Sequence, residues 1–147
     1  MPASRRTMLR GAALLAACGT ARAALAAHTP TPASKDAYIY IIWPQDGGRI
    51  RGPFWCRFGL RGMGVTHAGD ATANMGHHRL LIDVDEALNT EVPIPADKKH
   101  LHFGAGQTEV RLDLPPGPHT LQLVLGDAEH FPFDPPVVSR KIHITVV

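Results

Sequence analysis

The histidines are the side chains of this sequence whose number and spacing most directly suggest chemistry. There are nine of them, and five fall in three short segments. These segments are Gly76-His77-His78, His100-Leu101-His102 and Asp127-Ala128-Glu129-His130. Imidazole is the commonest protein ligand for zinc and copper, among other transition metals. The clusters therefore predict a transition-metal site, with copper as the first candidate and zinc as the second.

Strand geometry limits which histidines can share an ion. Successive side chains of a strand point to opposite faces, so His77 and His78 are not expected to bind the same metal. His100 and His102 share a face, with Cα atoms about 6.6 Å apart. Two sites are open: an outer one from His77, His100 and His102, and one at the end of the fold from His78, His102 and His130. We take the second set as the ligands, with His77 assisting.

Each histidine also has an ordinary structural interpretation. His78 fits a half-buried, hydrogen-bonded residue that closes the fold, and His100 fits a solvated surface residue. His119 follows a proline turn and is expected to be structural. His130 ends a Gly-Asp-x-x-His loop, in which Asp127 would orient the ring or cap a turn. The alternative function is a non-catalytic structural or interaction domain of the cell envelope, which binds a partner protein or a glycan.

The usual sequence signatures of enzymes are missing. There is no Gly-x-Ser-x-Gly elbow, His-Glu-x-x-His pair, Cys-x-x-Cys motif or phosphate loop, so we expect no enzyme. A small copper redox enzyme is the third alternative. Cys56 alternates with apolar residues and is expected to be a packed thiol. Met63 and Met75 lie in the glycine-rich segment 62–76 and would add thioether ligands suited to Cu(I).

Residues 1–27 have the pattern of an export signal. Three arginines between residues 5 and 10 precede a short apolar run and a region of small residues. The run at 11–17 is too short for a permanent transmembrane helix, which needs about 20 residues. Residues 4–10 resemble a twin-arginine signal, with an ordinary secretory leader as the alternative. We expect a periplasmic protein without a transmembrane span.

Two processing routes of this leader remain open. Leu15-Ala16-Ala17-Cys18 resembles a lipobox, which would leave Cys18 as a lipid anchor. Small-x-small sites at residues 21–23 and 24–26 would instead release a soluble protein. Cys18 is either acylated or removed with the leader, which leaves Cys56 as the one cysteine that could pair. No internal disulfide is therefore expected.

The charge that remains after export argues against nucleic acid as a partner. Four of the fifteen Lys and Arg residues lie in the leader, which leaves eleven against thirteen Asp and Glu residues, a net charge of −2. Binding to nucleic acid needs a basic face that neutralises phosphates. The expected partners are therefore a metal ion or an envelope protein.

Alternating apolar residues predict the elements that must position the histidines. Residues 54–60 alternate, as do 78–84, 110–114 and 119–125, and turn-forming segments of proline and glycine separate these runs. This pattern predicts an all-β, immunoglobulin-like antiparallel β-sandwich of about seven strands. We place the sandwich at residues 37–147, after a linker at 28–36, and expect a long loop at 62–76.

Several long motifs in a fixed order resemble a family of small exported bacterial domains of unknown function. They are Gly76-His77-His78-Arg79-Leu80-Leu81-Ile82-Asp83, Leu101-His102-Phe103-Gly104-Ala105-Gly106-Gln107-Thr108, Pro116-Gly117-Pro118-His119-Thr120-Leu121-Gln122-Leu123, Gly126-Asp127-Ala128-Glu129-His130 and Pro135-Pro136-Val137. The resemblance covers nearly all of residues 36–147 and implies a periplasmic sandwich domain. In two positions the chain departs from the family pattern, because Arg79 and Phe133 stand where the pattern has histidines.

Overall fold

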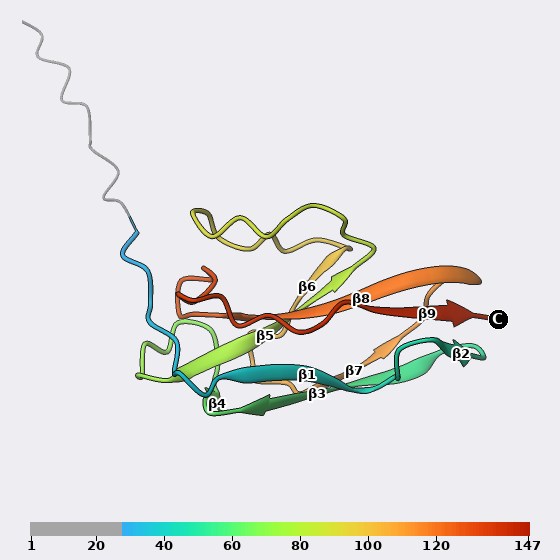
Figure 1. Ribbon diagram of the computed structural model, residues 1–147, viewed down its shortest axis with the longest axis horizontal. Coiled ribbons are helices and arrows are strands. Elements are labelled where there is room, and N and C mark those ends of the chain that lie inside the picture. Colours follow the sequence, from blue (N-terminus) through green and yellow to red (C-terminus); the bar gives the residue numbers. More distant parts are fainter. Residues whose placement is uncertain (1–27) are drawn as a thin grey trace, which may run out of the picture.

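The computed structural model describes residues 28–147, and these residues form two packed β-sheets (Figure 1). The leader and Cys18 lie outside the described residues. The described strands are β1 (Tyr38–Trp43), β2 (Gly48–Ile50), β3 (Phe54–Arg61), β4 (Gly64–Val65), β5 (Met75–Ile82), β6 (His100–His102), β7 (Glu109–Leu112), β8 (Gly117–Gly126) and β9 (Ile142–Val146).

The strand order confirms the predicted all-β sandwich and refines it. One sheet has the order β1-β3-β7, and the other has the order β2-β9-β8-β5, with both β4 and β6 pairing with β5. Most neighbours are antiparallel, but β2–β9 and β4–β5 pair in parallel. These parallel partners are short strands that the alternation does not reveal, which is why the described residues contain nine strands rather than about seven.

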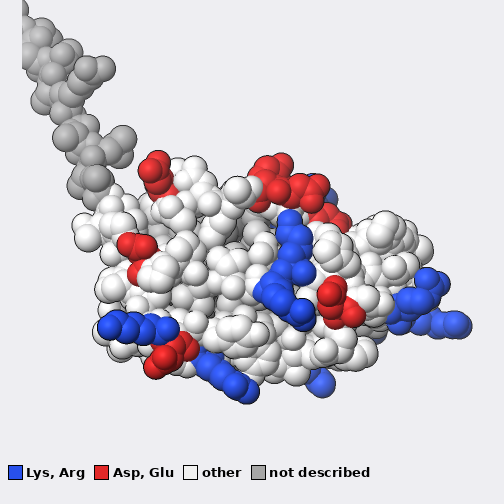
Figure 2. Space-filling model, in the orientation of Figure 1, with Lys and Arg blue, Asp and Glu red and all other residues white. Residues whose placement is uncertain are grey.

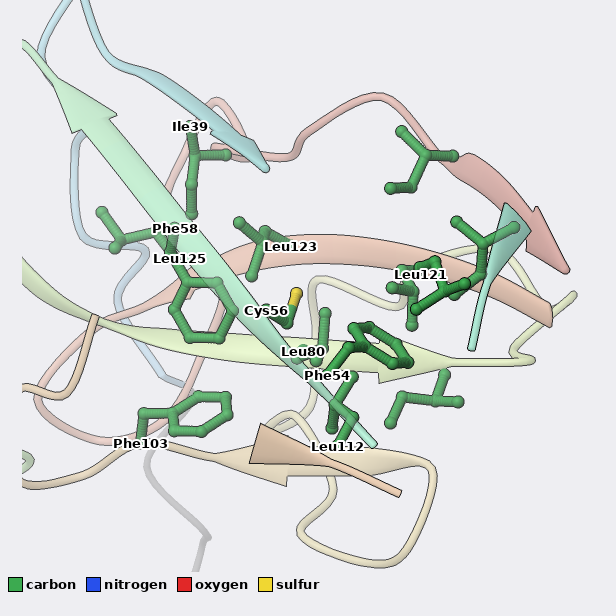
Figure 3. Close-up of a cluster of buried hydrophobic side chains, with 14 of the residues drawn as sticks. Ile39, Phe54, Cys56, Phe58, Leu80, Phe103, Leu112, Leu121, Leu123 and Leu125 are labelled. Atoms are coloured by element: carbon green, nitrogen blue, oxygen red, sulfur yellow. The ribbon is translucent and has the colours of Figure 1, made fainter. Parts of the chain in front are cut away.

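The main core lies between the two sheets and follows the predicted alternation. Phe54, Cys56 and Phe58 of β3 pack against Leu80 of β5 and against three leucines of β8 (Figure 3). Cys56 is fully buried, and burial raises the pKa of its thiol to about 12. The expectation of a packed thiol is therefore confirmed.

Strand β5 is buried on its second face as well. The segment 83–99, which joins β5 to β6, returns over this face (Figure 1). There Val84 and Ile94 form a second apolar cluster with Leu81 and Val124. As a result His77 is fully buried. The expectation that His77 belongs to an outer site was wrong in this respect, because the alternation shows which face a residue takes but not what covers that face.

Residues 28–36, the expected linker, pack against the segment that follows β8. The backbone N–H of Ala33 donates to the carbonyl of Asp134 at 2.9 Å. Thr31 Oγ1 donates to the carboxylate of Asp127 at 2.6 Å, and the ring of His28 stacks on Phe131 with centroids 3.6 Å apart. These contacts hold the N-terminal segment on the loop that carries His130.

The surface carries charges of both signs. On the face drawn in Figure 2, acidic and basic side chains are interspersed. Among residues 28–147, no helix is long and apolar enough to cross a membrane.

His78 belongs to the main core rather than to the covered face. Alternation places it with Leu80, and its ring lies 5.2 Å from that of Phe58. Neither ring nitrogen makes a hydrogen bond of ordinary geometry with the described residues. Burial lowers the pKa of His78 to about 4, an effect that the nearby backbone of Gln107 only partly offsets. His78 is therefore neutral in the folded protein at pH 7.

This buried imidazole predicts a stability that decreases in acid. Because the unfolded chain takes up the proton near pH 6.5 and the folded chain only near pH 4, the free energy of unfolding should fall as the pH decreases through that interval. We expect the free energy of unfolding of His78→Leu to decrease less over this pH interval than that of the wild type. Denaturant unfolding at a series of pH values measures this difference. His143→Gln, at an exposed position, is the control. An unchanged pH dependence in His78→Leu would contradict the assignment.

Candidate metal centre

Three histidines from distant parts of the sequence converge at one end of the covered face of β5. His77 comes from β5, His102 from the end of β6, and His130 from the loop after β8. Each offers a ring nitrogen, and the three nitrogens all lie within 4.8 Å of one another. The ring centroids form a nearly equilateral triangle, with separations of 5.0, 5.2 and 4.9 Å.

The strand ladder places the first two of these rings. His102 lies opposite Arg79 in the β5–β6 register, and Arg79 lies two residues after His77. Side chains two apart on a strand, and side chains directly opposite on neighbouring strands, share a face of the sheet. His77 and His102 therefore project from the same face, diagonally across the strand pair.

A tight turn places the third ring. The carboxylate of Asp127 accepts hydrogen bonds from the backbone N–H groups of Glu129 and Phe131, at 3.0 and 2.9 Å. His130 itself has a left-handed backbone, with φ of 74°. Its carbonyl accepts a hydrogen bond from Ile94 in the covering segment at 2.9 Å. Asp127 thus caps the turn, one of the two roles expected for it, and the turn returns His130 over β5.

Two glycines lie beside the rings, and one of them leaves space that a side chain would fill. A Cβ atom added to Gly104 would lie 2.6 Å from two ring atoms of His102, much closer than real contacts allow. At Gly126, which pairs with His77 in the β5–β8 ladder, an added Cβ would lie at an ordinary 3.4 Å from the His77 ring. The position of His102 therefore depends on the missing side chain at Gly104.

The surroundings keep two of the three rings uncharged. Burial is the largest cause that lowers the pKa of His77, to about 4, and the positive charges of Arg79, His102 and His130 act in the same direction. Asp127 opposes the change. The pKa of His102 is lowered as well, first by burial and then by Arg79. Neutral imidazoles have free lone pairs at pH 7, as metal ligation requires.

The ring nitrogens of the group are free of backbone and carboxylate partners in the part of the chain that is described. His130 Nδ1 and His77 Nε2 lie 3.2 Å apart and share one hydrogen bond. His77 Nδ1 is buried without a partner among the described residues. By contrast His119 Nδ1 lies 2.7 Å from a carboxylate oxygen of Asp83, as expected for a structural histidine.

Each predicted grouping contains two of the three residues of the trihistidine group, which is His77, His102 and His130. His77 and His102 come from the outer set, and His102 and His130 come from the end-of-fold set. His100 is separated from it, because its Nδ1 pairs with Asp97 at 2.9 Å. His78 also lies apart, on the core face of β5. That His77 and His78 take opposite faces agrees with the alternation argument.

Sequence reasoning missed the contributions of Arg79 and Gly104. Arg79 is 1% exposed and occupies the same face as His77, but in the sequence it stands out only as a departure from a family pattern. The available signal was its position two residues after His77, which places both side chains on the same face of the strand. For Gly104 we find no comparable signal, because its contact with His102 depends on how the chain turns after β6.

The geometry of the group suits a small transition-metal ion. Two imidazole nitrogens on a tetrahedral ion, each about 2.0–2.1 Å from it, are about 3.3 Å apart. The 3.2 Å separation in the His77–His130 pair matches this value. His77 is buried, His130 is half-buried and His102 is exposed, so solvent can reach the group at His102. Three protein ligands leave at least one coordination position for another group.

Comparisons with known proteins give a family but no activity. The family described as "Domain of unknown function (DUF4399)" matches residues 56–147. No curated protein matches the chain. Among solved structures, the chain is similar to the endo-beta-1,4-mannanase from Thermotoga petrophila, at 21% identity and a TM-score of 0.44. That match covers 77% of this chain and 20% of the mannanase, so the chain spans about a fifth of the mannanase's length.

The family match contains the residues of the candidate site. His77, His102 and His130 all lie within 56–147, as do Asp127, which caps the turn of His130, and Gly104, which makes room for His102. With more than half of its residues matched, the chain belongs to the DUF4399 family of domains of unknown function.

Proposed function

We propose that this domain binds one transition-metal ion through the trihistidine group. The observation that carries the proposal is the convergence of three imidazoles whose nitrogens have neither backbone nor carboxylate partners among the described residues. Among the described residues these nitrogens make one hydrogen bond, between His77 and His130. A metal ion would bind all three rings at once. The role would be storage, delivery or sensing of the ion, without catalytic turnover.

Copper is the first candidate and zinc the second. A set of imidazole ligands suits both ions, and divalent copper stands highest in the usual affinity order of first-row metals. Met75 lies two residues before His77 on β5, hence on the same face, and is half-buried. A thioether at this end of the site would favour Cu(I). Met63 packs against the main core instead, so we do not include it.

The cellular setting follows from the leader rather than from the fold. An export signal at residues 1–27 would deliver the domain to the periplasm, where copper and zinc are exchanged between envelope proteins. A lipid anchor at Cys18 would hold it at the membrane surface. The competing interpretation is that the three histidines are structural. In that case the His77–His130 hydrogen bond would stabilise the fold without a metal ion.

Titration with Cu²⁺ tests the proposal. We expect the purified protein to bind one equivalent with a Kd below about 1 µM, followed by the absorption and electron paramagnetic resonance of bound copper. His102→Asn and His130→Asn should each weaken binding by about tenfold or more, because each removes one of three ligands. Asparagine tolerates the left-handed backbone at residue 130.

The matched control for this titration is His100→Asn. His100 lies on the same short strand as His102 but pairs with Asp97, so its loss should leave copper affinity unchanged. If the wild-type protein takes up no stoichiometric metal, or if His100→Asn weakens binding as much as His102→Asn, the trihistidine site is refuted.

A pair of glycine substitutions tests the geometry without removing a ligand. Gly104→Ala forces the ring of His102 to move and should weaken Cu²⁺ binding by about tenfold. Gly126→Ala adds a methyl group at an ordinary contact distance from His77 and should leave the affinity close to that of the wild type. Equal affinities for both variants and the wild type would show that the position of His102 has no bearing on metal binding.

A further inference from the structure

Arg79 is a buried cation without an acidic partner in the described part of the chain. Its side chain is 1% exposed. Nη1 donates to the carbonyl of Pro95 at 3.1 Å, while Nε is buried without any partner among the described residues. No carboxylate of residues 28–147 lies within 4.0 Å of its guanidinium. A buried charge is costly unless it is paired, so this arrangement lacks an anion.

The guanidinium belongs to the neighbourhood of the trihistidine group. Arg79 lies directly opposite His102 in the β5–β6 ladder, and such pairs have Cβ atoms about 4.5–5.5 Å apart. It also shares a face with His77, two residues away. The positive charge of Arg79 acts on the rings of His77 and His102, since it helps to lower the pKa of each.

The carboxylates near this face already have partners. Asp127 accepts hydrogen bonds from Thr31 and from two backbone N–H groups of its own turn. Asp97 accepts from the backbone of Lys99 and pairs with His100. Neither comes within ion-pair distance of Arg79. A divalent ion held by neutral imidazoles would add two more positive charges beside the guanidinium, in surroundings where charges interact strongly.

We infer that Arg79 and the metal together bind an oxyanion, a carboxylate or a phosphate. One oxygen of the anion occupies the coordination position that the three histidines leave, and a second oxygen accepts hydrogen bonds from the guanidinium. The planar fork of Arg suits such an oxyanion, which a lysine ammonium would hold only as a point charge. This inference rests on the proposed metal site, and it assigns to that site a ligand class as well as an ion.

The test compares anions at constant ionic strength. Replacing chloride by acetate should tighten Cu²⁺ binding to the wild-type protein by about tenfold, the typical effect of a hydrogen bond to a charged group. Chloride has a single atom, so it cannot coordinate the metal with one oxygen while a second oxygen accepts from the guanidinium. In Arg79→Gln and Arg79→Lys, acetate and chloride should give the same Kd. Arg57→Gln removes an exposed arginine on β3 and should keep the anion effect.

A second arm identifies the oxyanion and does not depend on variants. Phosphate replaces acetate in the same titration, and the anion that tightens binding names the ligand class. On the Cu²⁺-loaded wild type, electron–nuclear double resonance should detect ¹³C of labelled acetate, or ³¹P of phosphate, within bonding distance of copper. If the Arg79 variants fail to fold, this signal and the wild-type titration decide the matter alone.

The outcomes separate the two proposals. Tight copper binding that is identical in chloride, acetate and phosphate overturns the oxyanion inference and leaves the metal site standing. An anion effect that survives in Arg79→Gln also overturns it, since the guanidinium would then have no part. Absence of stoichiometric copper binding in every anion refutes the metal site and, with it, the inference.

Discussion

The burial of β5 on both faces is the constraint on which the candidate site depends. One face packs against the opposite sheet through Leu80, and the other lies under the segment that joins β5 to β6. A strand in a two-layer sandwich usually has one face in water. Here the second face receives its own apolar cluster, and it places His77 and Arg79 out of contact with water.

This double burial explains the electrostatic character of the site. Removing water from His77 disfavours its charged form, which is the first cause of its lowered pKa. The same removal of water leaves the charge of Arg79 without solvation. Neutral lone pairs attract a cation, and an unpaired guanidinium attracts an anion. The two requirements lie side by side on one face, so a metal ion with an attached oxyanion would satisfy both.

The packing around the three imidazoles is as specific as the imidazoles themselves. Gly104 leaves the space that the ring of His102 occupies, and Asp127 caps the turn that returns His130. The N-terminal segment adds a further support, since Thr31 bonds to Asp127 and His28 stacks on Phe131. Several independent contacts therefore hold the three imidazoles in their positions.

Alternation by itself determined the all-β class, the core face of β3, β5 and β8, and the separation of His77 from His78, because side-chain direction along a strand has a period of two. It also identified His102 and His130 as candidates, since imidazoles in short clusters are unusual. Which of these histidines meet depends on how the strands and loops pack. Segment 83–99 returns over β5, and the left-handed turn at His130 lies against this segment. Both features depend on contacts between residues far apart in the chain, which no local pattern encodes. His100 instead pairs with Asp97.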